Sequence, residues 1–289
     1  MNDRQAGMLP IVNKDTATRN EVQMSKAKIL LLGSNATQIE LQGGGWAEIG
    51  QYLNETVIPS MALIDAGYDV VLATPNGTKP HIDQISDSAQ HFGDDEAAHA
   101  SARRFYDDDP SMNRVRTLRS VIEEGLDGYA GVFVPGGHAP VVDLMQDADI
   151  GTILRHFHEA AKPTALLCHG PVALAAAMPR AREFRAALVA GDRAAATSIA
   201  QGWAYGGYRM TVFSTEEEKW AEDNIFHARL PFYMPDALRL AGAEVTTGAT
   251  DWAPNIVVDR ELITGQNMAS DHALAATLIA ALDASLATV

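Results

Sequence analysis

Short apolar runs alternate with helix-length amphipathic stretches along most of this chain. The clearest runs are four to eight residues long, too short for a helix, and they cover 28–35, 70–73, 131–137 and 164–168. Parallel strands need crossover connections, which are usually helices, so this alternation is typical of a parallel sheet covered on both faces. The sequence therefore predicts an α/β fold with a parallel sheet sandwiched by helices.

Helix patterns fill the intervals between these runs. The stretch after Asn54 is the clearest, because its apolar residues recur at the spacing of one helix face. Later helices are expected near 150–161, from Gly170, over 216–226 and from Asp271. Later strands are expected at 208–214, 243–247, 255–259 and 262–266. We interpret the polar segment 78–128 as surface helices and 180–206 as a small cap, insertion or extended crossover.

We interpret the chain as one domain, because its 289 residues contain no internal repeat, low-complexity tract or convincing linker. This domain is placed at 27–289. Residues 1–26 mix charged and amide side chains and lack the apolar centre of a signal peptide, so we expect an N-terminal arm or a disordered leader. No run of about 18 apolar residues occurs, and no membrane span is expected.

The charge balance limits the expected partners. The formal net charge of −15 repels phosphate backbones and anionic lipid surfaces, so neither nucleic acid nor a membrane is an expected partner. Cys168 is the single cysteine, and it can form neither an internal disulfide nor a C-x-x-C zinc site. Because nothing in the chain requires an oxidising compartment, we expect a cytoplasmic protein.

Cys168 stands where a predicted strand ends and a helix begins. The sequence A-L-L-C-H-G-P joins an apolar run to Gly170 and Pro171, which suit the first turn of a helix. In an open α/β sheet, ligands bind beyond the carboxyl ends of the strands. A thiol at this turn matches a nucleophile elbow, and a helix N-terminus favours the thiolate. The alternative is an inert cysteine, since free cysteines are usually buried.

Further groups are expected at the same edge of the sheet. Gly136 and Gly137 follow a strand in V-F-V-P-G-G-H. Their N–H groups, with that of His169, suit an oxyanion hole, although the glycine pair also suits an ordinary tight turn. The side chain of His169 is a candidate for proton transfer, because it adjoins the thiol in the sequence. Glu55 begins a helix at this edge, where an acid also serves as a partner of the helix dipole.

The blocks around these residues resemble the ThiJ/PfpI superfamily. They include L-N-E-T-V-I-P, V-F-V-P-G-G-H, A-L-L-C-H-G-P and L-I-T-G-Q-N, and the resemblance runs from about Lys28 to the last helix. More narrowly, the chain is similar to the branch that contains glutathione-independent glyoxalase III, protein deglycases and holding chaperones. The resemblance implies a flavodoxin-like α/β sandwich and, by analogy with relatives, a homodimer.

The resemblance also implies roles for individual residues. Cys168 would be the nucleophile, His169 its partner, and Glu55 a carboxylic acid hydrogen-bonded to the sulfur. An acidic third member is expected after the strand at 208–213, within S-T-E-E-E. Counting along that segment favours Glu218, with Glu217 as the second choice.

Other positions bear on metal, cofactor and substrate. Some chaperone relatives bind a metal through a histidine where this chain has Ile64, so no metal is expected. Without an intact G-x-G-x-x-G or Walker signature, no nucleotide cofactor is expected. His138, His91 and Trp252 are expected to contact the substrate. Ala139 follows His138 where relatives often have glycine, a change that would reshape the mouth of the pocket.

The expected function is cysteine-dependent, glutathione-independent turnover of small reactive dicarbonyls, for example methylglyoxal to a 2-hydroxy acid. The expected partner is a small carbonyl substrate, and this chemistry needs no cofactor. An amidase or peptidase with the same elbow is one alternative, although no His-x-Glu follows His169, which disfavours glutamine hydrolysis. A holding chaperone of the stress response, which binds exposed apolar segments, is the other.

Overall fold

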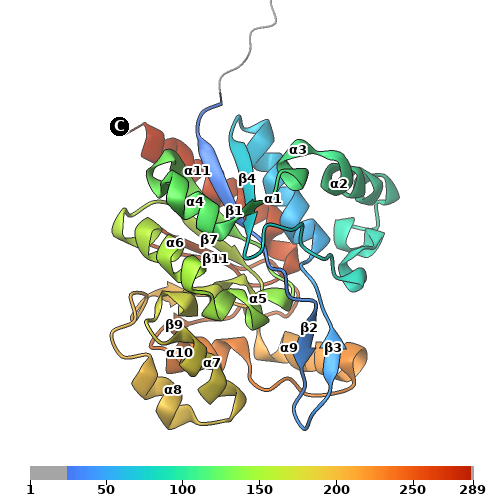
Figure 1. Ribbon diagram of the computed structural model, residues 1–289. Coiled ribbons are helices and arrows are strands. Elements are labelled where there is room, and N and C mark those ends of the chain that lie inside the picture. The colour runs from blue at the N-terminus through green and yellow to red at the C-terminus, as the bar shows by residue number, and fades with distance from the viewer. Residues whose placement is uncertain (1–24, 288–289) are drawn as a thin grey trace, which may run out of the picture.

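The computed structural model describes residues 25–287 and is built around a seven-stranded sheet in the order β10-β11-β7-β6-β1-β4-β5 (Figure 1). Its strands are β1 (Lys28–Leu32), β4 (Asp69–Thr74), β5 (Arg116–Thr117), β6 (Tyr129–Val134), β7 (Thr164–Leu167), β10 (Ile256–Asp259) and β11 (Leu262–Gly265). Every neighbouring pair is parallel except β10 with β11. The predicted α/β fold is confirmed. The predicted arm at 1–26 lies outside the described residues, apart from its last two.

Helices cover both faces of this sheet, as Figure 1 shows. Helices α1 and α11 pack on one face, and α4, α6 and the 3₁₀ helix η5 pack on the other. Strand β1 shows the cause: Ile29 and Leu31 join the core under α1 and α11, whereas Leu30 and Leu32 join the opposite core. A strand buried on both faces needs apolar side chains in succession, which is the run seen in the sequence.

The α-helices are α1 (Leu53–Asp65), α2 (Glu96–Asp108), α3 (Pro110–Asn113), α4 (Leu118–Glu124), α5 (Ala139–Val142), α6 (Ala148–Glu159), α7 (Ala181–Val189), α8 (Arg193–Ile199), α9 (Thr215–Ala221), α10 (Met234–Leu240) and α11 (Asp271–Leu286). The 3₁₀ helices are η1 (Gln84–Ser86), η2 (Ala89–Phe92), η3 (Leu126–Gly128), η4 (Leu144–Gln146), η5 (Gly170–Ala177) and η7 (Met268–Ser270), and η6 (Glu222–Phe226) is a π-helix. Two small strand pairs join β2 (Gln38–Glu40) to β3 (Trp46–Glu48) and β8 (Arg209–Met210) to β9 (Glu244–Val245). Between residues 25 and 287, no helix combines the length and apolar character that a bilayer crossing needs.

Three segments differ from, or refine, the expected elements. The helix from Gly170 is the 3₁₀ helix η5 rather than an α-helix. The strand expected at 208–214 is confined to β8, because Thr211 N–H donates to the Thr264 hydroxyl and Phe213 N–H to the Cys168 carbonyl instead of a regular ladder. The segment 180–206 contains α7 and α8, which pack on each other and on η5 and α10.

The carboxyl ends of β6 and β7 lie side by side and position the candidate site. Their register pairs Val134 with Leu166, so the turn after β6 meets the turn after β7. Helix α1 begins beside both turns, since Tyr52 N–H donates to the Gly136 carbonyl. Ligands of open α/β sheets bind at such an edge.

Candidate active site

Cys168 occupies a sharp turn between β7 and η5. Its φ is 59°, a left-handed conformation that is uncommon for a residue with a Cβ and is held only where neighbours fix it. Two hydrogen bonds supply this constraint: Cys168 N–H donates to the Gly265 carbonyl, and Phe213 N–H donates to the Cys168 carbonyl, both at 2.9 Å. The side chain lines a cavity of about 440 Å³ and is itself 1% exposed. The elbow expected from the sequence is therefore present.

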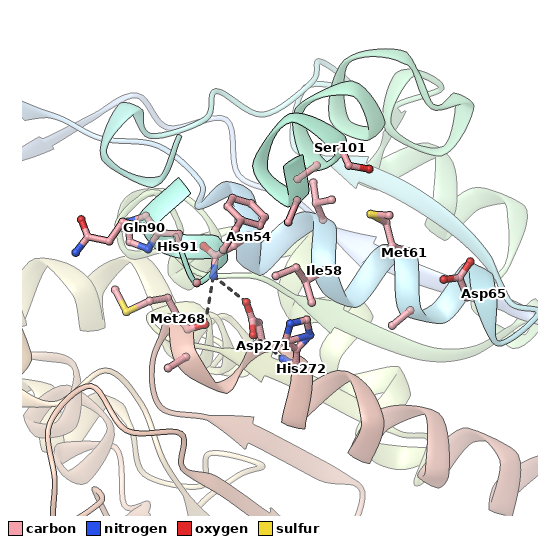
Figure 2. A pocket seen from close by; sticks show the side chains of 17 residues that line it. Asn54, Ile58, Met61, Asp65, Gln90, His91, Ser101, Met268, Asp271 and His272 are labelled. Carbon is pink, nitrogen blue, oxygen red and sulfur yellow. Dashed lines mark hydrogen bonds between the residues drawn. The ribbon is translucent and has the colours of Figure 1, made fainter. Parts of the chain in front are cut away.

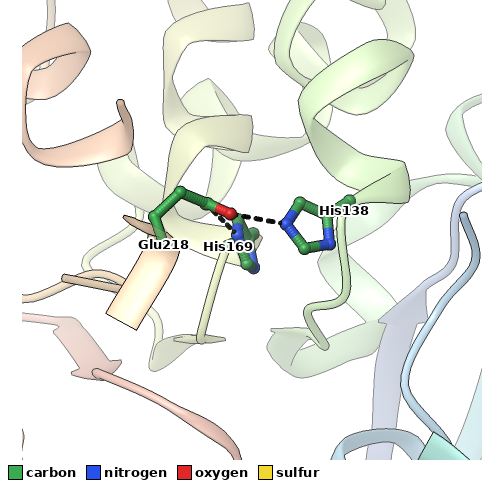
Figure 3. Close-up of side chains that lie close together, drawn as sticks. All are labelled: His138, His169 and Glu218. Atoms are coloured by element: carbon green, nitrogen blue, oxygen red, sulfur yellow. Dashed lines mark hydrogen bonds and ion pairs between the residues drawn. The ribbon is translucent and has the colours of Figure 1, made fainter. Parts of the chain in front are cut away.

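His169 lies between the thiol of Cys168 and the carboxylate of Glu218, and Figure 3 shows its contact with Glu218. Its Nδ1 is 3.2 Å from Sγ of Cys168, and its Nε2 is 2.7 Å from Oε2 of Glu218. Burial alone would raise the pKa of Glu218, but two imidazoles and their hydrogen bonds hold it well below its usual range. The ionised carboxylate can only accept, so Nε2 carries the proton and the Nδ1 lone pair faces the thiol. This tautomer is the one that can remove the thiol proton.

A second histidine shares this carboxylate. His138 Nε2 is 2.8 Å from Oε1 of Glu218, and the rings of His138 and His169 lie 4.1 Å apart between centroids. Burial would lower the pKa of His138, but the Glu218 charge and hydrogen bond raise it. Burial and the charge of His138 lower the pKa of His169 despite Glu218. The arrangement favours a charged His138, an ionised Glu218 and a neutral His169 that acts as a base.

Glu55 is fully buried on the first turn of α1, beside the thiol. Its Oε2 accepts a 2.9 Å hydrogen bond from Gly136 N–H, and its Oε1 has no hydrogen-bond partner among the described residues. Burial raises the pKa of Glu55 to about 8, although interactions with Cys168 and Gly136 lower it and the charge of Asp271 raises it further. A carboxyl group with this pKa exchanges its proton near neutral pH, as general acid–base catalysis requires.

The expected ionised thiol is not supported. Burial raises the pKa of Cys168 well above its usual range, and the charges of Glu55 and Glu217 raise it further, whereas the Gly137 N–H lowers it. The resting side chain is therefore a neutral thiol, and it needs His169 as a base before it can attack.

The expected oxyanion hole also requires a correction. Gly136 cannot offer its N–H to a substrate oxygen, because that group already donates to Glu55. Gly137 remains a candidate: its N–H lies against the sulfur of Cys168, and its φ of 84° suits a residue without a Cβ. That the backbone N–H of His169 contributes to the oxyanion hole stays a prediction. Gly136 instead provides space, since a Cβ there would lie 2.5 Å from Oε2 of Glu55.

The structure brings Glu218, rather than Glu217, to His169. Glu217 forms a capping box with Ser214 at the start of α9. It also accepts hydrogen bonds from Trp252 N–H and from the Asn267 amide, and so holds the loop around Trp252 in place. Its role in the described contacts is structural.

The wall of the cavity contains the three residues expected to contact a substrate: His138, His91 and Trp252. The ring of His138 is committed to Glu218, whereas His91 packs edge-on against Tyr52. Sequence reasoning missed other residues of this wall, among them Tyr52, Phe213, Trp220, Ile225 and Met268. Tyr52 precedes Glu55 by three residues and Trp220 follows Glu218 by two. Their proximity in the sequence to these candidate catalytic residues could have predicted that they line the cavity.

His138, His169 and Glu218 are also the one group in residues 25–287 whose donor atoms could together hold a metal ion, since they lie within 4.8 Å of one another. Both Nε2 atoms already bond to the carboxylate, so protons satisfy this cluster as it stands. Ile64, which stands where some chaperone relatives are expected to have a metal-binding histidine, lies on α1.

Comparisons with known proteins show what the chain is similar to. The model of the DJ-1/PfpI family matches residues 50–183, a span that contains Glu55, Cys168 and His169. The chain is 26% identical over 254 residues to the protein/nucleic acid deglycase HchA of Staphylococcus aureus strain MSSA476, covering 86% of this chain and 77% of that relative.

Two solved structures show the same fold. The Rapid Encystment Protein 24 KDa of Francisella tularensis superposes with a TM-score of 0.67 at 20% identity, covering 89% of this chain and 99% of that one. Glyoxalase III of Candida albicans gives 0.61 at 18% identity, covering 88% and 97%. The flavodoxin-like α/β sandwich expected from the sequence is confirmed.

Proposed function

We propose that this chain is a member of the DJ-1/PfpI family, whose model matches residues 50–183, and that it converts small 1,2-dicarbonyls such as methylglyoxal into 2-hydroxy acids. Cys168 is the nucleophile, His169 and Glu55 move the protons, and glutathione takes no part. One observation carries the proposal: a fully buried carboxyl group with a pKa of about 8 lies beside a thiol that faces the lone pair of a histidine.

The first step forms a covalent hemithioacetal. Sγ of Cys168 attacks the aldehyde carbon while its proton passes to Nδ1 of His169, 3.2 Å away. The aldehyde oxygen takes the proton of Glu55, and the Gly137 N–H supports the negative charge that develops on this oxygen. Glu55 is then ionised and His169 is charged.

The second step moves hydrogen between the two carbons. Ionised Glu55 removes the C–H proton of the hemithioacetal carbon, and His169 protonates the ketone oxygen, which gives an enediol. His169 then takes the proton of the hydroxyl on the sulfur-bearing carbon, and Glu55 delivers its proton to the neighbouring carbon. The product is a thioester of a 2-hydroxy acid, formed without an external oxidant.

Hydrolysis completes the cycle. A water molecule gives its hydroxyl to the thioester carbon and its proton to Glu55, and the carbon–sulfur bond breaks. The departing sulfur takes the proton of His169, so all three residues return to their starting states. In sum, one dicarbonyl and one water become one 2-hydroxy acid.

The curated relative extends the substrate class that we propose. HchA is named a protein/nucleic acid deglycase, so dicarbonyls carried as early adducts of amines or thiols are further candidates for this chain. A hydrolase with the same Cys–His–Glu arrangement would not need a protonated carboxyl group beside the sulfur, and this is why dicarbonyls are the favoured class.

A substrate panel tests the proposal. Wild type, Cys168→Ala and Glu55→Gln are assayed without glutathione on methylglyoxal, glyoxal, an aryl ester and an aryl amide. We expect the wild type to form lactate from methylglyoxal with the highest kcat/KM of the panel, and both variants to lose this activity. Higher kcat/KM for the amide or ester, retained in Glu55→Gln, would instead identify a hydrolase. Wild-type protein without dicarbonyl turnover would contradict the proposal.

A further inference from the structure

A second cavity lies beside α1 (Figure 2) and adjoins the cavity at Cys168, because Gln90, His91, Met268 and Ala269 line both. Its volume is about 770 Å³, larger than the cavity at Cys168, and α1, α2, η2 and the start of α11 form its walls. Cavities of this size accommodate small organic ligands. Neither Cys168 nor His169 lines it, so the mechanism above leaves it without a role.

Asn54 lines this cavity and carries a buried acceptor without a partner among the described residues. The side-chain Nδ2 donates to the Met268 carbonyl at 3.2 Å and to Oδ2 of Asp271 at 2.8 Å, as the dashed lines in Figure 2 show. These two acceptors fix the orientation of the amide, so Oδ1 must be the other atom. Asn54 is 1% exposed, and its Oδ1 has no hydrogen-bond partner among the described residues. A buried acceptor without a donor costs about 1–3 kcal/mol, and a ligand that donates would remove this cost.

The charge of the lining is negative. Asp271 and Asp65 are its carboxylates, and neither lysine nor arginine occurs among the residues that line it. Burial raises the pKa of Asp271, whereas the hydrogen bond from Asn54 and the charge of His272, which also lines the cavity, lower it. Burial also lowers the pKa of His91, which favours its uncharged form. The polar end of the cavity therefore suits a cation with N–H groups.

The remaining surface is apolar. Val57, Ile58 and Met61 follow Asn54 along one face of α1, at the spacing of successive helical turns. Phe92 closes the cavity from η2. A hydrocarbon body that extends from the amide end would bury its surface against this stripe.

We propose that this cavity binds a small organic cation, a primary ammonium on a hydrocarbon body, with the ammonium between Asn54 Oδ1 and Asp271 and the hydrocarbon along Val57, Ile58 and Met61. The charge of Asp271 is among the causes that raise the pKa of Glu55. An ammonium that neutralises Asp271 would lower this pKa, and the cavity would then tune the acid of the active site. This last consequence rests on the proposed function, whereas binding itself does not.

Three probes of one length test the proposal: hexylammonium, hexanol and hexanoate, titrated into the full chain by calorimetry, with the Tm as a second readout. We expect saturable binding of one hexylammonium per chain, binding about tenfold weaker for hexanol, and none for hexanoate. Cys168→Ala should bind hexylammonium as the wild type does, which separates this result from any failure of the proposed function.

Variants locate the site. Asp271→Asn should weaken hexylammonium about tenfold or more, whereas Glu96→Gln, which removes an acid outside the lining, should leave it unchanged. Ile58→Trp fills the cavity and should abolish binding while a cooperative thermal transition reports intact folding. Equal binding of all three probes, or no saturable binding, would overturn the proposal. So would a dimer that Ile58→Trp converts to monomers, because a second copy would then occupy the cavity.

Discussion

Gly136→Ala tests whether the close approach of α1, β6 and β7 at this glycine positions Glu55 and Cys168 for catalysis. A Cβ at Gly136 would lie 2.5 Å from Oε2 of Glu55, 2.6 Å from Cβ of Cys168 and 2.7 Å from the Leu167 carbonyl. Ordinary contacts begin at 3.4 Å, so each of these neighbours must retreat by about 0.7–0.9 Å. Leu167 belongs to β7, and backbone hydrogen bonds hold Cys168 on both sides, which leaves the Glu55 carboxyl group as the part that yields.

The expected cost has two parts. Overpacking a buried position costs about 1–3 kcal/mol of unfolding free energy, and each kcal/mol lowers the Tm by about 2–4 °C in domains of somewhat smaller size. Displacing a catalytic group by about 1 Å lowers kcat/KM about 10²-fold. Thermal scanning and methylglyoxal kinetics measure the two effects.

Gly128→Ala is the matched control, because Gly128 precedes the opposite end of β6 and a Cβ there meets nothing within 4 Å. We expect it to keep the wild-type kcat/KM and Tm. If Gly136→Ala also kept the wild-type kcat/KM and Tm, the close contacts of Glu55, Cys168 and Leu167 with this glycine would not position the active site, contrary to this prediction.

Three further predictions concern the buried charges. Glu218→Gln should lower kcat/KM about 10²–10⁴-fold, because an amide cannot accept from both imidazoles, whereas Glu216→Gln on the exposed side of α9 should have no effect in the same methylglyoxal assay. His138→Gln should move the acid limb of the pH profile of kcat/KM to higher pH, since removing the neighbouring cation raises the pKa of His169; an unmoved limb would contradict this. Glu55 loses its proton near 4.5 in the unfolded chain and near 8 in the folded chain, so the folded chain holds one proton more between these values. The unfolding free energy of the wild type relative to Glu55→Gln should therefore fall by about 1.4 kcal/mol per pH unit across this window and level off above about 8, as chemical denaturation can measure; a flat difference would refute the raised pKa.

The sequence located the strand ends and the thiol because those signals are local. An apolar run that ends at Cys168 and continues into Gly-Pro defines an elbow from a few adjacent residues. The sequence distinguished less clearly between Glu217 and Glu218 as the acid that contacts His169. A local signal existed, because Ser214 followed three residues later by Glu217 is typical of a capping box, which leaves Glu218 to face the histidine.

Other features depend on distant contacts and could not be read from spacing. The expected ionised thiol is not supported, because burial and the charges of Glu55 and Glu217 raise the pKa of Cys168. Gly136 loses its role as a donor because Glu55, far away in the sequence, takes its N–H. The strand at 208–214 is shorter than expected because Thr211 and Phe213 bond to a side chain and to the elbow.

Trapping the covalent intermediate tests whether Cys168 is the nucleophile. Wild-type protein is mixed with methylglyoxal without glutathione, quenched in acid during the first turnover, digested and mapped by mass spectrometry. We expect one methylglyoxal unit on the peptide that contains Cys168, rising and decaying at the rate of lactate formation, and no such adduct in Cys168→Ser. Lactate formed at the wild-type rate by Cys168→Ser, or by wild type whose Cys168 peptide stays unmodified throughout, would contradict it.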